Sequence, residues 1–263
     1  MKNRVTEKFY TKDEVAKKCI TSLDGIIKLG VYLEPSCGEG AFSNNLQDCI
    51  VITNDIDTLC KADTNIDFLN YRYTRDDDFI LIGNPPFGRQ SALAKAFIKH
   101  GAKMPKCAGI AFILPRSFKK PSMYSVFPPC FHLELELDLE PNSFIHEDIE
   151  YNVPAVFQVW LRKKHMREIY HKIEPINFKY VKKDNIYINL IIRRVGSKAG
   201  QAYLPDTSYN YNSNSHYFIQ VTKDVDITAL LAKINIQKYP DNTVGPRSIS
   251  KPELNAVLNS IIL

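Results

Sequence analysis

VYLEPSCGEG, at residues 31–40, joins a short apolar run to a glycine-containing turn. Residues 31–33 predict a buried strand, and the pattern from 41 to 46 predicts a helix directly after the turn. Only glycine lets a backbone turn this tightly and lie against a ligand. The stretch therefore predicts a ligand-binding turn, with a purely structural turn as the alternative. Two phosphate loops are excluded, because Ser43 replaces the third glycine of Gly-x-Gly-x-x-Gly and no Gly-Lys-Ser/Thr is present.

Further apolar runs follow at 49–53, 79–83 and 108–114, with helical spacing at 13–29 and 91–100. Strands that alternate with helices predict a parallel sheet covered on both faces. Residues 131–137 alternate strictly, and we expect them to pair with 153–161 across a turn at Pro141 and Asn142, as an antiparallel hairpin at the end of the sheet. Beyond these, strands at 187–195 and 217–221 and helices near 226–236 and 250–262 are expected.

The composition is that of an ordinary soluble globular protein, with 263 residues, 44% hydrophobic and 24% charged. No apolar run approaches the roughly 20 residues of a membrane helix, and the first residues are too polar for a signal peptide. We therefore expect no membrane association and an intracellular location, in cytoplasm or nucleus. The six cysteines form no Cys-x-x-Cys pair and the six histidines show no ligand spacing, so no metal is expected.

Charge divides the chain in two. Residues 1–160 hold 18 basic and 21 acidic side chains, whereas 161–263 hold 16 and 8, for net charges of −3 and +8. We predict one domain over 1–162 and a small basic α+β extension over 163–263. A concentrated positive field is typical of nucleic-acid binding, and a merely solvated surface is the alternative.

Asp55 follows a predicted strand, and Asp67 with Phe68 could follow a third strand. Asp55 comes 17 positions after Gly38, at the end of the second strand, where a carboxylate can accept hydrogen bonds from both hydroxyls of a ribose. This position favours a cofactor that contains adenosine. Asp67 and Phe68 would then hold the adenine by its amino group and its ring face, unless they lie in a surface loop.

NPPF, at residues 84–87, carries the chemistry. Two prolines fix the backbone and leave the Pro85 carbonyl and the Asn84 side-chain oxygen as acceptors. If both hydrogens of a planar amine are held by these acceptors, its lone pair is directed toward a methyl donor, and no strong base is needed. Phe87 offers a face on which a flipped-out base stacks. The alternative is a strand that simply ends in prolines.

Together these motifs resemble the amino-methyltransferases of the Rossmann-like superfamily that uses S-adenosylmethionine. EPSCGEGAF resembles their cofactor loop, Asp55 their ribose acid and NPPF their catalytic motif. KFYTKDEVA resembles the segment before the loop in adenine-N6 methyltransferases, although Lys12 stands where that segment often has Pro. The resemblance covers residues 9 to 160. It implies a seven-stranded sheet with a reversed last strand, catalysis by Asn84, Pro85, Pro86 and Phe87, and cofactor contacts from Tyr10, Thr11, Glu34, Pro35, Cys37, Gly38, Gly40, Asp55, Ile56, Asp67, Phe68 and Asn84.

The favoured hypothesis is methyl transfer from S-adenosylmethionine to N6 of adenine in DNA or RNA, with DNA slightly preferred. Six cations would then contact substrate phosphates, unless they lie in solvated loops: Arg116, Lys119, Lys120, Arg193, Arg194 and Lys198. A protein glutamine N5-methyltransferase is the alternative, because that amide nitrogen is also planar. A catalytically silent binding subunit is a third hypothesis. The sequence makes no prediction of the oligomeric state.

Overall fold

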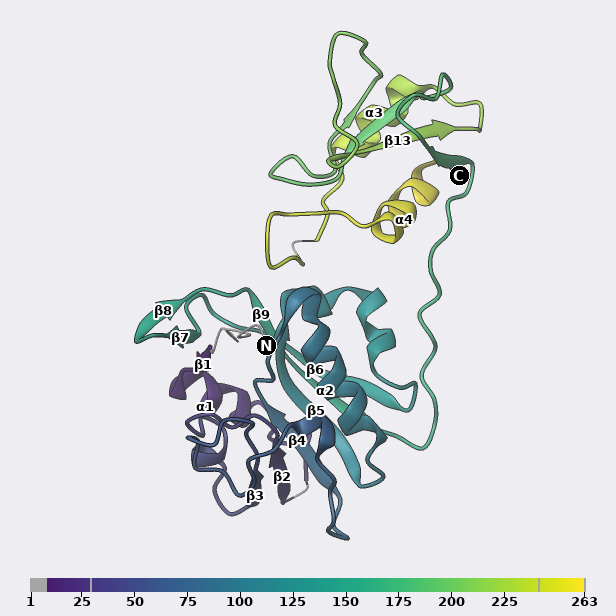
Figure 1. The fold of residues 1–263 in the computed structure, drawn as a ribbon. Helices are drawn as coiled ribbons and strands as arrows, with labels where there is room; N and C mark the ends of the chain where they lie inside the picture. The colour runs from purple at the N-terminus through teal and green to yellow at the C-terminus, as the bar shows by residue number, and fades with distance from the viewer. Residues whose placement is uncertain (1–8, 29, 241, 263) are drawn as a thin grey trace. The chain divides into compact units, whose positions relative to one another are not determined.

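The computed structural model describes residues 9–28, 30–240 and 242–262. The chain forms two compact units, Met1–Tyr170 and His171–Leu263 (Figure 1). The division lies eight residues beyond the boundary expected at 162. Arg167 explains part of this difference, because its side chain donates to the carbonyl oxygens of Tyr124 (2.6 Å), Phe127 (2.9 Å) and Phe131 (3.0 Å) and so ties the basic stretch to the first unit.

The first unit is built on a mixed sheet in the order β3-β2-β4-β5-β9-β6. The strands β3, β2, β4 and β5 run parallel to one another, and β9 runs antiparallel to both β5 and β6. Among the described residues the sheet has six strands rather than seven, and a single parallel bridge from Asn54 to Thr64 stands where a further strand would start. The strands are β2 (Val31–Glu34), β3 (Ile50–Thr53), β4 (Phe79–Gly83), β5 (Cys107–Pro115), β6 (Phe131–Asp138) and β9 (Ala155–Arg162).

Both faces of this sheet are covered, as expected for parallel strands with apolar runs. Successive side chains of a strand point to opposite faces. Phe112 packs in the core cluster that contains Phe97 of α2 (Ala92–Lys103), whereas Ile113 packs in the cluster that contains Ala16 of α1 (Asp13–Thr21). The two helices therefore lie on opposite faces of the sheet, and the apolar runs are buried from both sides.

Strands β6 and β9 pair antiparallel as predicted, but two local details of the prediction were wrong. Residues 41–46 form only the 3-10 helix η1 (Ser43–Asn45) rather than a full helix. Between β6 and β9 the chain makes not a simple turn but a hairpin of β7 (Phe144–His146) and β8 (Ile149–Tyr151), with Asn142 in the left-handed region at φ +61°. This hairpin pairs with β1 (Tyr10–Thr11) in a separate three-stranded sheet (Figure 1).

Four more 3-10 helices, η2 (Phe68–Asn70), η3 (Arg89–Ser91), η4 (Arg116–Lys119) and η5 (Pro121–Val126), connect elements of the first unit. The second unit has an antiparallel sheet in the order β10-β13-β11-β12, made by β10 (Phe178–Val181), β11 (Leu190–Arg193), β12 (Ala202–Tyr203) and β13 (His216–Val221). Helices α3 (Ile227–Asn235) and α4 (Lys251–Ile262) share its core. Within the described ranges, no helix combines the length and apolarity that a bilayer crossing requires.

Candidate active site at the carboxyl edge of the sheet

Three predicted motifs meet at the carboxyl ends of β2, β3 and β4. These strands are parallel neighbours, so the segments after them emerge at one edge of the sheet. Hydrogen bonds join the segments directly: the Ser36 hydroxyl donates to the Asn84 carbonyl oxygen (3.2 Å), and the Gly38 N–H donates to the Asp55 carboxylate (2.8 Å). The glycine turn, the acid and NPPF therefore form one connected site.

The turn needs its glycines. Gly38 has φ +52° and Gly40 has φ +81°, a region that other L-residues adopt only at a cost. A Cβ atom on Gly38 would lie 2.9 Å from Cε1 of Tyr10, so the Tyr10 ring lies directly against the turn. The N-terminal segment predicted to contact the cofactor thus lies at the same place as the loop.

Asp55 fastens the ends of two strands while it keeps acceptor capacity. One carboxylate oxygen accepts from the Gly38 N–H and the other from the Asp57 N–H, each at 2.8 Å. Each oxygen of a carboxylate can accept a second hydrogen bond, so both can still take a hydroxyl. Ile56, the next residue, is 70% exposed and offers an apolar surface beside the carboxylate.

Asn84 is oriented by the N-terminal segment. Its side-chain nitrogen donates to the Phe9 carbonyl oxygen at 3.2 Å, which leaves the amide oxygen on the other side of the group. Pro85 is buried, while Pro86 is half-buried. Phe87 is also half-buried and packs against both core clusters of the unit. Beyond it, Gly88, Gln90 and Ser91 all have positive φ, so the loop folds sharply back into α2.

Glu34, Pro35 and Cys37, which the sequence resemblance places at the cofactor, are all buried. Glu34 is 2% exposed, and its carboxylate accepts a hydrogen bond from the Ser43 N–H at 2.9 Å. Burial raises the pKa of Glu34 to about 7 and the pKa of the Cys37 thiol to about 12. Through Ser43, the Glu34 carboxylate ties the end of β2 to the start of η1, and the cofactor contacts of these three residues stay a prediction.

Phe68 does not have the position that the sequence suggested. Its ring is 1% exposed and packs in the core, 4.8 Å from Phe97 and edge-on to His100 at 5.1 Å. No open face is left to hold an adenine. Asp67 is half-buried, and its carboxylate caps the short η2 helix by accepting from the Leu69 N–H at 2.9 Å.

Two features of the site were missed in the sequence. Asn54 is fully buried, and its side chain donates to the carbonyl oxygens of Pro35 (3.1 Å) and Ile66 (3.0 Å), so it joins the glycine turn to the segment at the sheet edge. An asparagine at the end of an apolar run is the only signal that could have indicated it. The β7–β8 hairpin holds β1 in place, with Phe9 stacked on Tyr151 at 4.8 Å, and no local pattern announces this contact.

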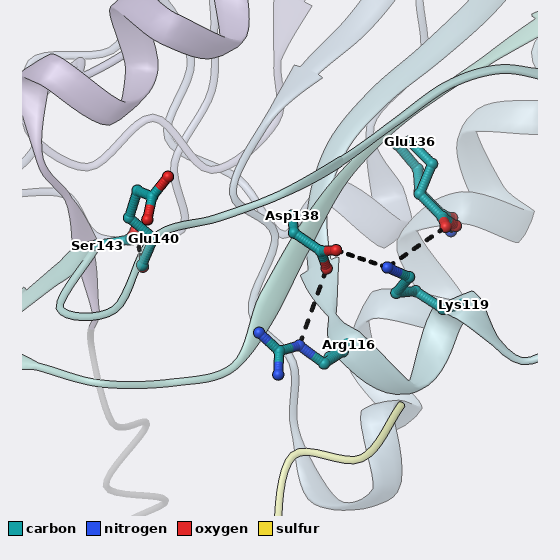
Figure 2. A network of polar contacts seen from close by, with 7 residues as sticks. Arg116, Lys119, Glu136, Asp138, Glu140 and Ser143 are labelled. Atoms are coloured by element: carbon teal, nitrogen blue, oxygen red, sulfur yellow. Dashed lines mark hydrogen bonds and ion pairs between the residues drawn. The ribbon is translucent and has the colours of Figure 1, made fainter. Parts of the chain in front are cut away.

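The basic residues after β5 are paired with acids. Lys119 lies 2.7 Å from Asp138 and 3.8 Å from Glu136, and Arg116 lies 3.9 Å from the same Asp138 (Figure 2). Both acids stand on the strand β6, whose polar face the sequence alternation had indicated. The local charge of this cluster is therefore close to balanced. Lys120 is half-buried in the same segment.

The basic residues after position 160 are divided between the two units: those up to Tyr170 belong to the first unit and the others to the second. With the boundary after Tyr170, the first unit holds 22 basic and 22 acidic residues and the second holds 12 and 7. In the second unit, Arg193 donates from Nε to the Val195 carbonyl oxygen at 2.9 Å, Arg194 lies over the Tyr217 ring at 5.2 Å, and Lys198 is exposed. The net positive charge of the chain therefore belongs to the second unit. Across the described residues, no cluster of three or more His, Cys, Asp or Glu side chains is placed to hold a metal.

No family model matches the sequence, and no curated protein matches it. Solved structures show partial similarity. The 23S rRNA methyltransferase ErmE superposes with a TM-score of 0.46 at 17% identity, over 60% of this chain and 71% of ErmE. A proposed RNA methyltransferase from Pyrococcus horikoshii gives 0.45 at 17% identity, over 60% and 87%. The modification subunit of a proposed type I restriction enzyme from Vibrio vulnificus gives 0.44 at 12% identity, over 84% of this chain and 60% of the subunit. Similarity at this level does not place the chain in any of these families.

Proposed function

We propose that this chain is a methyltransferase that moves a methyl group from S-adenosylmethionine to N6 of adenine in a nucleic acid. The observation that carries the proposal is the hydrogen-bonded site at the ends of β2, β3 and β4. It brings together a glycine turn, a carboxylate with spare acceptor capacity and an Asn-Pro-Pro-Phe segment whose asparagine is held from one side.

The residues present fit S-adenosylmethionine. Asp55 would accept the ribose hydroxyls, and the exposed Ile56 would lie along the adenine. The Thr11 hydroxyl, one residue after Tyr10, is buried without a hydrogen-bond partner in the described part of the chain. The short η1 helix is no obstacle, because this cofactor carries no pyrophosphate for a helix N-terminus to bind. When bound, the cofactor supplies an electrophilic methyl group on a sulfonium.

The protein would then act by orientation. The Asn84 amide oxygen and the Pro85 carbonyl oxygen accept the two hydrogens of the target amine, which draws the nitrogen lone pair out of conjugation with the ring. Phe87 stacks against the base and holds it in the plane that this geometry requires. Fixing Asn84 through Phe9 matters because an acceptor that is already oriented costs no reorganisation when the reaction occurs.

A nucleic-acid substrate is supported by the charge of the second unit, with 12 basic and 7 acidic residues. The ion pairs of Arg116 and Lys119 weaken their own assignment as phosphate contacts, and the basic second unit is the better candidate. DNA and RNA both remain within the proposal.

The test is transfer of a labelled methyl group to total DNA, total RNA and a protein extract, followed by digestion and identification of the methylated product. N6-methyladenine in either nucleic acid is the expected result. Asn84→Ala should retain cofactor affinity and lose about 100-fold or more in turnover. Label only on protein glutamine would favour the amide substrate instead, and no transfer to any of the three would refute the enzyme assignment.

A further inference from the structure

A cavity of ≈ 350 Å³ lies in the second unit and is lined by four cations, Lys182, Lys183, Arg194 and Lys251. Its other lining residues are Tyr180, Val181, Ser213, His216, Tyr217 and Phe218, so no acidic side chain in the described part of this unit faces it. The volume is at the lower end of the range of about 300–1,000 Å³ for small-ligand pockets. Four like charges around a hollow without a carboxylate create a strong positive potential.

The topology of the sheet brings these cations together. Strand β13 pairs antiparallel with β10 and with β11, so its start lies beside the ends of both neighbours. Lys182 and Lys183 follow β10, and Arg194 follows β11. The Arg194 carbonyl oxygen accepts from the Ile249 N–H at 2.9 Å, which places the start of α4, and with it Lys251, at the same edge.

Carboxylates do not neutralise these cations. Within the described residues, none of the four forms a salt bridge. The Arg194 Nε atom is buried without a hydrogen-bond partner, which leaves a charged donor to be satisfied. Glu253, on the first turn of α4, accepts hydrogen bonds from Ser250 and Asn242 and does not line the cavity.

Aromatic rings hold the cations rather than offering themselves to a ligand. Arg194 lies over the Tyr217 ring at 5.2 Å, and the Lys251 Nζ atom lies 4.3 Å from the centre of the Tyr180 ring. A cation above a ring is stabilised by the quadrupole of the ring, and it occupies one of the two faces of that ring. The cations held in this way suit an anion such as a phosphate.

We propose that this cavity binds a phosphodiester group of the nucleic-acid substrate and grips the strand without regard to its base sequence. The inference rests on the proposed function and gives it a second point of contact, in a different unit from the catalytic edge. Of the three cations first assigned to phosphates in this unit, it selects Arg194, because Arg193 and Lys198 do not line the cavity.

The test compares two triple variants of the full chain that lose the same charge. In the cavity variant, Lys182, Lys183 and Lys251 are replaced by Gln. In the control variant, the exposed Lys223, Lys233 and Lys238 of the same unit, which lie outside the cavity, are replaced by Gln. Binding of fluorescent single-stranded DNA and RNA of mixed sequence is measured by anisotropy over a range of salt concentrations.

The expected result is a loss in the cavity variant of about 0.7 units in the slope of log affinity against log salt, since one phosphate contact on a single strand contributes about that much. The control variant should keep the slope of the parent. Equal losses in both variants would show that overall charge and not the cavity matters, and unchanged binding in both would likewise overturn the proposal. A parent that binds neither strand would instead refute the nucleic-acid substrate itself, so the two failures are distinguishable.

Discussion

Replacement of Gly38 by alanine tests the proposed cofactor site most directly. Gly38 has φ +52°, so any side chain there carries the cost of the left-handed region, about 1–2 kcal/mol. The new Cβ would also lie 2.9 Å from Tyr10 Cε1, where ordinary contacts begin at 3.4 Å, so the ring must move by about 0.5 Å or more. The Tyr10 ring and the turn would then no longer fit against each other at the proposed cofactor position.

Gly25 provides a matched control, since it has φ +76° and nothing lies within 4 Å of a Cβ placed there. Gly25→Ala and Gly38→Ala should therefore both lose stability through backbone strain. Only Gly38→Ala should also weaken the binding of S-adenosylmethionine, with a Kd at least about tenfold higher, equivalent to about 1.4 kcal/mol. Calorimetric titration measures the affinity, and thermal unfolding confirms that both variants are folded. Equal cofactor affinity in the parent and in both variants would remove the cofactor from this turn.

Three further predictions concern Phe87 of the proposed catalytic loop, the buried acid Glu34 and Arg167 of the basic stretch. Phe87→Ala should raise KM for an oligonucleotide and lower kcat, whereas Phe87→Tyr, which keeps the ring, should do neither; equal kinetics of the two variants would contradict stacking. The pKa of Glu34 is about 7 when folded and near 4.5 when unfolded, so the parent should lose up to about 3 kcal/mol as pH rises through this window. Glu34→Gln should lack that loss, and a stability difference between the two that does not change with pH would disprove the assignment. Arg167→Ala leaves three carbonyl oxygens without their donor and should lower Tm by about 5 °C, a cost of about 2 kcal/mol. The exposed Lys164→Ala is its control and should leave Tm unchanged.

Local pattern was enough to locate the strands that carry the candidate site. The apolar runs at 31–33, 49–53 and 79–83 lie within one residue of β2, β3 and β4. Short apolar runs that alternate with helices predict a parallel sheet. The carboxyl ends of neighbouring parallel strands lie at the same edge of the sheet. The proximity of Gly38, Asp55 and Asn84 follows from this topology, and the hydrogen bonds between their segments agree with it.

Tertiary contacts decided where the Phe68 ring packs and with which acids Arg116 and Lys119 pair. Phe68 was expected to present its ring face to an adenine, but the ring packs in the core against Phe97 and His100. In the sequence, Arg116 and Lys119 could be phosphate contacts or residues of a solvated loop. In the structure, both side chains form ion pairs with Asp138 of β6. The sequence gives the number of charged side chains, but only the folded structure determines which opposite charges lie close enough to form ion pairs.

The sequence by itself located the apolar strands of the sheet, the glycine turn and the NPPF segment that follow two of them, and the basic C-terminal part of the chain. These properties depend on residues that are neighbours along the chain. Only the tertiary structure decided that the β7–β8 hairpin holds the N-terminal segment against the turn and that four cations from three separate segments of the second unit surround one cavity. Contacts between residues far apart in the sequence leave no periodic signal, because the pattern around each residue reflects only its local secondary structure.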